Sequence, residues 1–303
     1  MEYFDFAVSY IWEYDVEFVK ILEDTFLENE LSFYVIWDEN ATYVADALKN
    51  RKLDFGAYLD RASDVDERFD PIGKILTRRK KLIINPYDKI EFASDKATMH
   101  LEFIANGIYT PYTIIIPPYK KNKFIYISIA DLAKLGRPFI IKPANTTGGG
   151  IGVVTGAETL EDALKERKQF DADKYLLQEK IEPTILDGRR AWFRCFWSCG
   201  KVIPTWWDDL THVYKIVYPE EIEKYKLYEL YKITRKIHKI TGMNFFSTEI
   251  AITKDNKFVS IDYVNDQCDM RPKSNHYDGV PDEVIYDIAY YMMNFVYKNL
   301  YQK

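Results

Sequence analysis

One stretch, residues 137–152 with the sequence RPFIIKPANTTGGGIG, most constrains what this chain can fold into. An apolar run over 139–141 leads into Lys142, and a polar, glycine-rich turn follows. A lysine at the end of a buried strand, next to a turn of bare backbone N–H groups, is suited to binding a polyphosphate. The turn does not end in Gly-Lys-Ser or Gly-Lys-Thr, so it is not a P-loop. The stretch therefore predicts another class of phosphate site.

Strands and helices alternate over the first part of the chain. Alternation of this kind favours a parallel sheet covered by helices. No G-x-G-x-x-G follows the first strand, so this lobe carries no dinucleotide fingerprint. The expected elements are strands over 5–11, 31–37 and 55–59, helices over 15–30 and 41–53, and a further helix through Ile75 and Leu82.

A second lysine stands at the start of a helix. Ser94 is the expected N-cap of a helix that ends at Asn106 and Gly107, which puts Lys96 in the first turn. A cation there opposes the helix dipole, at a cost of about 0.3 to 1 kcal/mol. Two interpretations stay open: Lys96 is a surface residue paired with Asp95, or it points at a bound phosphate.

The remaining elements are predicted from the same patterning. Apolar residues at spacings of three and four indicate helices with one buried face. The expected strands cover 113–116, 174–179, 192–198 and 201–206, and the expected helices cover 220–241 and 282–300.

A hairpin over residues 245–265 carries two facing carboxylates. Its turn centres on Asp255 and Asn256, and symmetric pairing about that centre places Glu249 opposite Asp262. Like charges that face each other across a strand pair destabilise it unless something neutralises them. The pairing therefore predicts a site that attracts positive charge.

A divalent cation would neutralise this pair. Asn265, just downstream, adds a neutral oxygen of the kind that magnesium accepts beside nucleotide phosphates. Alternation along the strands places Ser247 and Ser260 on the same face as the carboxylates. Two alternatives stay open, a solvent-exposed polar face with splayed charges and an acid and base pair of glycosidase type.

Bulk properties narrow the class of protein. The net charge of −6 argues against a nucleic-acid partner. The three cysteines form no disulfide framework, which favours a reducing compartment. Glu2 and Asp5 are unlike a secretion signal, and no apolar run reaches the length of a membrane span. We expect a soluble cytoplasmic protein with no membrane partner, and a homodimer is left open.

With Lys96, residues 137–152, the strand end at 178–181 and the carboxylate hairpin in this order, the chain resembles the ATP-grasp superfamily. The likeness covers about residues 92 to 303 and is to the arrangement of D-alanine–D-alanine ligases, glutathione synthetases and RimK-type glutamate ligases. It implies a mixed α/β and α+β fold. The implied domains are a Rossmann-like parallel α/β (pre-ATP-grasp) domain over 1–91, a central lid subdomain over 92–180 and a C-terminal subdomain over 181–303.

The resemblance also implies residue roles. Lys96 and Lys142 would bind the α and β phosphates of ATP, and Arg194 would act on the transferring phosphate. Arg271 would hold a substrate carboxylate or the γ-phosphate, and either arginine could instead be a surface ion-pair partner. The other implied nucleotide contacts are Thr146, Thr147, Gly148, Gly149 and Gly150 in the lid loop, Gln178, Glu179, Lys180 and Ile181 at the adenine, and Asp187 at the ribose.

The metal ligands that the resemblance implies are Glu249, Asp262 and Asn265, which would hold magnesium or manganese. In the family the second acidic residue and the asparagine are two positions apart. Here they are three apart, so either a bulge corrects the spacing or Asn265 is displaced.

The implied activity is that of a carbon–nitrogen ligase. ATP would phosphorylate a carboxylate, and an amine or thiol would attack the acyl phosphate to build an amide or peptide-like bond on a small metabolite or peptide. A small-molecule kinase of the same fold and a non-catalytic nucleotide-binding regulator are the alternatives. A cluster after the central hairpin could line the substrate pocket or be purely structural, and its members are Trp206, Trp207, Asp208 and His212.

Overall fold

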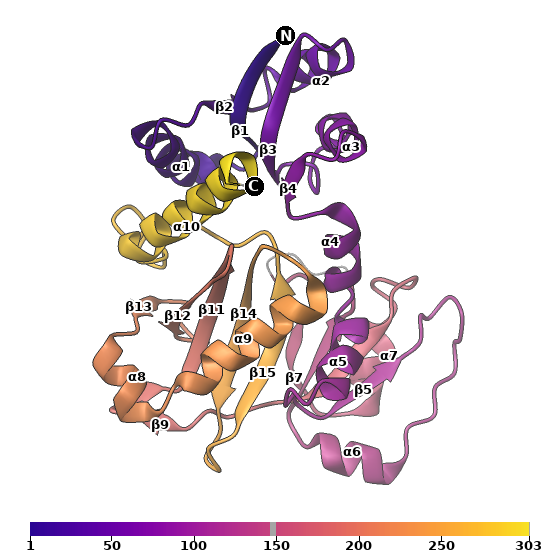
Figure 1. Ribbon diagram of the computed structural model, residues 1–303. Helices are drawn as coiled ribbons and strands as arrows, with labels where there is room; N and C mark the ends of the chain where they lie inside the picture. The colour runs from indigo at the N-terminus through magenta and orange to yellow at the C-terminus, as the bar shows by residue number, and fades with distance from the viewer. Residues whose placement is uncertain (146–149, 303) are drawn as a thin grey trace.

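The computed structural model describes residues 1–145 and 150–302, and its N-terminal part is a parallel sheet (Figure 1). The strand order is β2-β1-β3-β4, and each neighbouring pair is parallel. The predicted parallel α/β lobe is therefore confirmed. Its elements are β1 (Glu2–Tyr10), η1 (Glu13–Asp15), α1 (Val16–Glu28), β2 (Phe33–Ile36), α2 (Ala41–Lys49), β3 (Leu53–Arg61), α3 (Asp70–Arg78) and β4 (Leu82–Ile84).

The helix predicted through Ile75 and Leu82 is wrong in its second half. α3 ends at Arg78, and Lys80 has a φ of 56°, a left-handed conformation that ends helices. Leu82 then pairs with Ala57 of β3. Burial in the sheet decides the conformation of this short apolar run, which fits a strand or a helix by pattern alone.

The central part is an antiparallel sheet with the strand order β5-β8-β6-β7. The glycine-rich stretch of the sequence follows its strand β6, so Lys142 stands near the end of a buried strand as predicted. The elements here are α4 (Tyr87–Ser94), α5 (Lys96–Ala105), β5 (Thr113–Ile116), α6 (Ile129–Leu135), β6 (Phe139–Pro143), β7 (Val154–Ala157), α7 (Leu160–Glu166) and β8 (Tyr175–Glu179).

The N-cap of α5 differs from the prediction. Asp95, rather than Ser94, accepts hydrogen bonds from the backbone N–H groups of Ala97 and Thr98 at 3.0 and 3.2 Å. Ser94 is the last residue of α4, and its hydroxyl donates to the carbonyl of Glu91 at 3.1 Å. The caps shift by one residue because two helices meet here with only Asp95 between them.

The C-terminal part holds a five-stranded antiparallel sheet with the order β13-β12-β11-β14-β15. The helix predicted over 220–241 is two helices, because Lys226 takes a left-handed φ of 54°. The elements are β9 (Ile185–Leu186), β10 (Arg189–Arg190), β11 (Trp192–Ser198), β12 (Lys201–Trp207), β13 (Tyr214–Ile216), α8 (Pro219–Tyr225), α9 (Tyr228–Thr241), β14 (Phe245–Ile252) and β15 (Phe258–Asn265).

The last helix, α10 (Asp282–Tyr301), returns to the N-terminal lobe and lies beside α1 (Figure 1). Phe18 and Leu22 of α1 share one core cluster with Ile285 and Ile288 of α10. The N-terminal lobe and the last helix of the chain therefore share one hydrophobic core. Among residues 1–145 and 150–302, no helix combines the length and apolar character that a membrane crossing requires.

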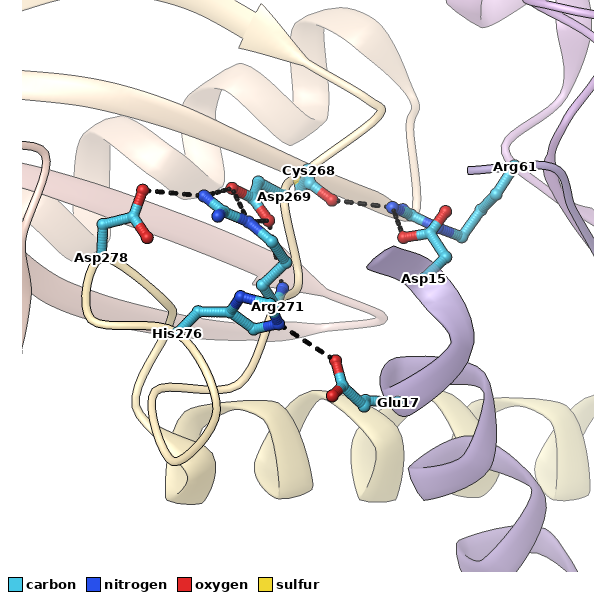
Figure 2. A network of polar contacts seen from close by, with 8 residues as sticks. All are labelled: Asp15, Glu17, Arg61, Cys268, Asp269, Arg271, His276 and Asp278. Atoms are coloured by element: carbon cyan, nitrogen blue, oxygen red, sulfur yellow. Dashed lines mark hydrogen bonds and ion pairs between the residues drawn. The ribbon is translucent and has the colours of Figure 1, made fainter. Parts of the chain in front are cut away.

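A buried arginine connects the N-terminal lobe to the segment after β15 (Figure 2). Arg61 donates two hydrogen bonds to Asp15, at 3.0 and 2.6 Å, and a third to the carbonyl of Cys268 at 2.9 Å. The side chains of this ion pair are 3% and 2% exposed. The end of β3 therefore fixes the position of the chain that leaves the carboxylate hairpin.

Candidate functional site

The carboxylate hairpin forms as predicted. Glu249 of β14 pairs in register with Asp262 of β15, and on its other side Glu249 pairs with Arg194 of β11. Paired residues on antiparallel strands project from the same face of a sheet. Three charged side chains therefore stand side by side on one face.

Two register shifts in the hairpin decide which side chains reach this face. Ile250 pairs with Ser260 and Glu249 with Asp262, so Ile261 is an extra residue. A second shift, between Glu249 and Ser247, places Asn265 opposite Ser247. The bulge that the three-residue spacing required is thus present, and Asn265 belongs to the carboxylate face.

The prediction that Ser260 lies on the carboxylate face is wrong. Ser260 pairs with the core residue Ile250, and its hydroxyl lies 3.4 Å from that of Thr248. Both neighbours belong to the opposite face of β14. The extra residue Ile261 shifts the alternation by one, because every bulge reverses the faces beyond it.

Glu249 is almost fully enclosed by its partners. One carboxylate oxygen accepts from a guanidinium nitrogen of Arg194, and the other accepts from the indole Nε1 of Trp192 at 3.1 Å. The side chains of Glu249 and Arg194 are 11% and 14% exposed. Burial raises the pKa of Glu249, and repulsion from Asp262 adds to the rise while Arg194 opposes it. The carboxylate is therefore a strong acceptor for further positive charge.

Lys142 reaches across from the central sheet to the same place. Its Nζ lies 3.9 Å from the Oδ1 of Asp262 and donates to the carbonyl of Ile261 at 3.3 Å. Burial lowers the pKa of Lys142, although Asp262 acts in the opposite direction. The Lys142 side chain is 8% exposed and that of Asp262 is 36% exposed. The two sheets thus meet at a lysine and a carboxylate that keeps access to solvent.

Lys96 joins this group through the backbone. Its N–H donates to the carbonyl of Ala144 at 3.1 Å, which holds the start of α5 against the end of β6. Burial would raise the pKa of Asp262, but the charges of Lys142 and Lys96 lower it. Lys96 also helps to lower the pKa of Lys142. Lys96 and Lys142, the two lysines expected at the phosphates, are therefore near each other and near Asp262.

Sequence reasoning missed a buried network beneath Lys142. The ring centroid of Tyr263 lies 5.1 Å from the Lys142 Nζ. The Tyr263 hydroxyl lies 2.9 Å from the Nδ1 of His100 and accepts from the Nε2 of Gln178 at 3.0 Å. The position of Tyr263 directly after Asp262 is the sequence signal that could have located this network. Strand alternation alone predicts only that the Tyr263 ring lies in the core.

This network predicts a pH dependence of stability. Burial, with a further contribution from Lys142, lowers the pKa of His100 from 6.5 to about 4. The unfolded chain then binds the proton more tightly, so the free energy of unfolding decreases by about 3 kcal/mol as pH falls from 6.5 to 4. His100→Gln should remove most of this decrease in urea unfolding at pH 7 and pH 4.5. His212→Gln, in an exposed loop, is the control, and an unchanged pH dependence in His100→Gln would refute the assignment.

The predicted nucleotide contacts lie on several elements. Thr146, Thr147, Gly148 and Gly149 lie outside the described residues, whereas Gly150 is described and has a φ of 79°. Gln178 and Glu179 end β8, and Lys180 and Ile181 directly follow it. The backbone N–H of Glu179 donates to Tyr112 at 2.8 Å. Because β8 pairs with β6, this strand end lies in the same sheet as Lys142.

Asp187 lies in the turn between β9 and β10. Its carboxylate accepts from the Nζ of Lys224 and from the hydroxyl of Tyr225. These α8 partners hold the side chain on a half-exposed surface. Its proposed contact with a ribose remains a prediction.

The aromatic and acidic cluster is divided between two faces of the sheet. Trp206 is buried against Phe193, with ring centroids 4.4 Å apart, on the face covered by α9. Trp207 lies on the carboxylate face, where its ring stacks on His212 at 5.2 Å and contacts the Arg194 guanidinium at 4.6 Å. Asp208 accepts from two backbone N–H groups of its own turn. Strand alternation thus leaves Trp207 and His212 as the members near the charged row.

Arg271 is bound by carboxylates of its own segment (Figure 2). It donates to Asp269 at 3.0 and 2.7 Å and to Asp278 at 2.9 Å. The interpretation as an ion-pair partner accounts for all of these contacts. A role in substrate binding stays a prediction.

The donor set on the carboxylate face fits magnesium. Two carboxylates and one amide oxygen are hard ligands, and magnesium commonly takes only one or two carboxylates beside phosphate oxygens. Among residues 1–145 and 150–302, no group of three or more His, Cys, Asp or Glu side chains could hold a metal.

The chain has an α/β lobe followed by two antiparallel sheets, and these sheets bring a buried lysine against a hairpin with paired carboxylates. Comparison with solved structures shows that this arrangement is the ATP-grasp fold. A D-alanine–D-alanine ligase from Bacillus anthracis complexed with ATP has a TM-score of 0.65 and 13% identity, covering 100% of this chain and 99% of that chain. A RimK domain ATP-grasp protein from Sphaerobacter thermophilus has a TM-score of 0.62 and 17% identity, covering 96% and 99%.

A macrocyclase from Microcystis aeruginosa, bound with a precursor peptide, has a TM-score of 0.62 and 13% identity, covering 95% of this chain and 99% of that chain. In sequence, a D-alanine–D-alanine ligase from Oenococcus oeni is 29% identical over 179 residues, or 53% of this chain. The match spans 46% of that ligase, so it covers about half of the relative's length. No protein-family model matches the chain.

Proposed function

We propose that this chain is an ATP- and magnesium-dependent ligase that joins a carboxylate to an amine, or to a thiol, through an acyl phosphate. The observation that carries the proposal is the charged row of Asp262, Glu249 and Arg194, with the Lys142 Nζ 3.9 Å from Asp262. A site with both signs of charge can hold a metal and phosphate oxygens together. The fold of the solved neighbours supports the same reading.

The reaction consists of two displacements. A carboxylate oxygen of the acid attacks the γ-phosphorus of ATP, and the bond to ADP breaks. The amine then attacks the carbonyl carbon of the acyl phosphate, and phosphate leaves with the proton of the amine passing to solvent or to a base. Neither step needs a covalent enzyme nucleophile.

The contribution of the chain is electrostatic. Lys142 and Lys96 would offset charge on the α and β phosphates, and Arg194 would offset charge on the transferring phosphate. Magnesium held by Glu249, Asp262 and Asn265 would supply Lewis-acid neutralisation of phosphate charge. The adenine would lie at the end of β8, and the loop that the family resemblance implies over residues 146–152 would cover the phosphates. Because desolvated charges interact more strongly, burial of Lys142 would strengthen its contact with a phosphate.

The activity is tested by incubating the protein with ATP, magnesium chloride and pools of acids and amines. We expect ADP and phosphate to form at a substantial rate only when an acid and an amine are both present. ADP with a stable phosphorylated product from one substrate would identify a kinase instead. No ADP in any mixture, together with measurable ATP binding, would leave a nucleotide-binding regulator.

A further inference from the structure

The last helix, α10, is apolar or aromatic on almost every side. Four of its 20 residues are charged, and two of these are the first two residues of the helix. One face packs into the core through residues such as Ile285, Ile288 and Met292. A helix that is apolar all round is typical of an element with every side covered. In this chain the outer face of α10 is exposed.

The exposed face of α10 carries a stripe of four tyrosines. The members of this tyrosine stripe are Tyr286, Tyr290, Tyr297 and Tyr301, which are 56%, 49%, 40% and 55% exposed. Their spacings of four, seven and four residues place them on one side of the helix, over a length of about 22 Å. Tyrosine is among the residues enriched where proteins bind one another.

Another long helix of the same chain shows a different kind of exposed face. Apart from one tyrosine in its first turn, the exposed residues of α9 are cationic, and they are Lys232, Arg235, Lys236 and Lys239. Charged side chains keep a helix face in water, whereas aromatic rings gain free energy when they are covered. The outer face of α10 therefore has the composition of an interface.

Part of the tyrosine stripe is already held in place. The Tyr301 hydroxyl donates to the carboxylate of Asp5, and the Tyr301 ring centroid lies 5.6 Å from that of Tyr297. Side chains that are ordered before binding lose less entropy when a partner docks. The C-terminal half of the stripe is thus prepared for a contact.

The tyrosine stripe is symmetric about its own midpoint, which lies between residues 293 and 294. Tyr290 and Tyr297 are equally far from this point, and so are Tyr286 and Tyr301. A twofold axis through the midpoint would pack two copies of α10 antiparallel, with each tyrosine opposite a tyrosine of the partner. This self-complementary spacing points to a second copy of the chain as the occupant.

Two charged residues beside the tyrosine stripe fit the same symmetry. Asp287 and Lys298 are exposed and eleven residues apart, so they stand on the same flank of α10. In the antiparallel pair, the Asp287 of each copy would lie about 3 Å, measured along the helix axis, from the Lys298 of the other. Within the described part of the chain, neither residue forms an ion pair. A second copy would supply the missing partner of both.

The exposed area of the tyrosine stripe indicates the strength of such a dimer. An aromatic side chain has an area of about 150 to 250 Å², so four half-exposed tyrosines contribute about 400 Å² per copy. With the flanking side chains, two copies would bury about 1,000 Å², the low end for specific interfaces. We therefore expect a dissociation constant of about 10 μM.

We propose that the tyrosine stripe of α10 is the interface of a twofold homodimer. The two copies of α10 pack antiparallel, and the Asp287 of each copy pairs with the Lys298 of the other. The proposal does not depend on the ligase function, because the interface contains no residue of the charged row.

The dimer is tested by sedimentation equilibrium of the full chain at about 1 to 100 μM. We expect the apparent mass to rise from 35.8 kDa to twice that value, with a Kd of about 10 μM. Tyr290→Ser removes the ring opposite the partner's Tyr297 and should raise the Kd about tenfold or more. Lys239→Asp, at an exposed position of α9, is the control and should leave the Kd unchanged.

Charge reversal tests the antiparallel register. Asp287→Lys and Lys298→Asp should each raise the Kd about tenfold, because each places like charges opposite one another at two symmetric positions. An equimolar mixture of the two variants should dimerise about as tightly as the wild type, since every lysine then faces an aspartate. Both positions are exposed, so neither substitution disturbs the core.

Three results would overturn the proposal. A wild-type chain that stays at 35.8 kDa up to about 100 μM would exclude the dimer and leave the tyrosine stripe to a partner of another kind. A dimer that Tyr290→Ser does not weaken would use another face of the molecule. Charge-reversed variants that fail to complement each other in the mixture would exclude the antiparallel pairing.

Discussion

Asp262→Asn is expected to lower the rate of ADP formation by on the order of a thousandfold, as happens when a group that stabilises transition-state charge is removed. The Asp262 side chain is 36% exposed, lies opposite Glu249 and is 3.9 Å from the Lys142 Nζ. The substitution keeps the shape and removes one negative charge. The free energy of unfolding should change by less than about 1 kcal/mol, because a lost pairing with Lys142 is offset by relief of repulsion on Glu249.

The matched control is Asp255→Asn at the tip of the same hairpin. Within the described part of the chain, the partners of Asp255 are its loop neighbours Lys257 and Thr253. It should retain wild-type turnover. Turnover in Asp262→Asn within threefold of the wild type would show that the carboxylate pair is not the reaction centre.

Arg194→Met is expected to destabilise the fold by about 3 to 5 kcal/mol, the cost of leaving one partner of a buried ion pair alone. Of the two side chains that donate to Glu249 in the described residues, the variant would keep the indole N–H of Trp192 at 3.1 Å, in a site where the Glu249 side chain is 11% exposed. The Trp207 ring would also lose the guanidinium that it contacts at 4.6 Å. Urea unfolding of the variant measures the loss.

A double-mutant cycle separates the ion pair from simple packing. Arg194→Met combined with Glu249→Gln should recover most of the lost stability, because no buried charge is then left unpaired. Arg235→Met, at an exposed position of α9, should change stability by less than about 1 kcal/mol. Equal losses in the single and double variants would mean that the charge on Glu249 does not matter.

The facing carboxylates could be predicted from sequence because a short hairpin loop fixes register. The pairing of Glu249 with Asp262 is confirmed, yet it arises by another route than simple symmetry. Ile252 pairs with Phe258, so counting from the turn alone would bring Ile261 opposite Glu249. The bulge at Ile261 restores the pairing and also turns Ser260 away, and nothing in the residue pattern locates a bulge.

The central lysines could be located because each one stands at the end of a regular element. Their meeting at Asp262 could not, since it depends on how two sheets that are distant in sequence pack together. The backbone bond from Lys96 to Ala144 and the contact from Lys142 to Ile261 both cross between elements. Long-range contacts of this type leave no periodic signal in a single sequence.

Two further differences follow from backbone detail. The break at Lys226 interrupts an apolar pattern that continues on both sides, so periodicity predicts one helix where there are two. Trp206 and Trp207 are adjacent in sequence and look like one cluster, but strand alternation sends them to opposite faces. Of these two residues, Trp207 lies beside the charged row.

The central claim is ligation through an acyl phosphate, and an oxygen-transfer measurement tests it most directly. The acid identified in the pooled assay is labelled with oxygen-18 in its carboxylate and incubated with the protein, ATP, magnesium and the amine. The phosphate that is released is then analysed by mass spectrometry. Our account predicts one labelled oxygen in each phosphate formed with product, because the carboxylate oxygen that attacks the γ-phosphorus leaves with it. Unlabelled phosphate accompanying the amide product would contradict it.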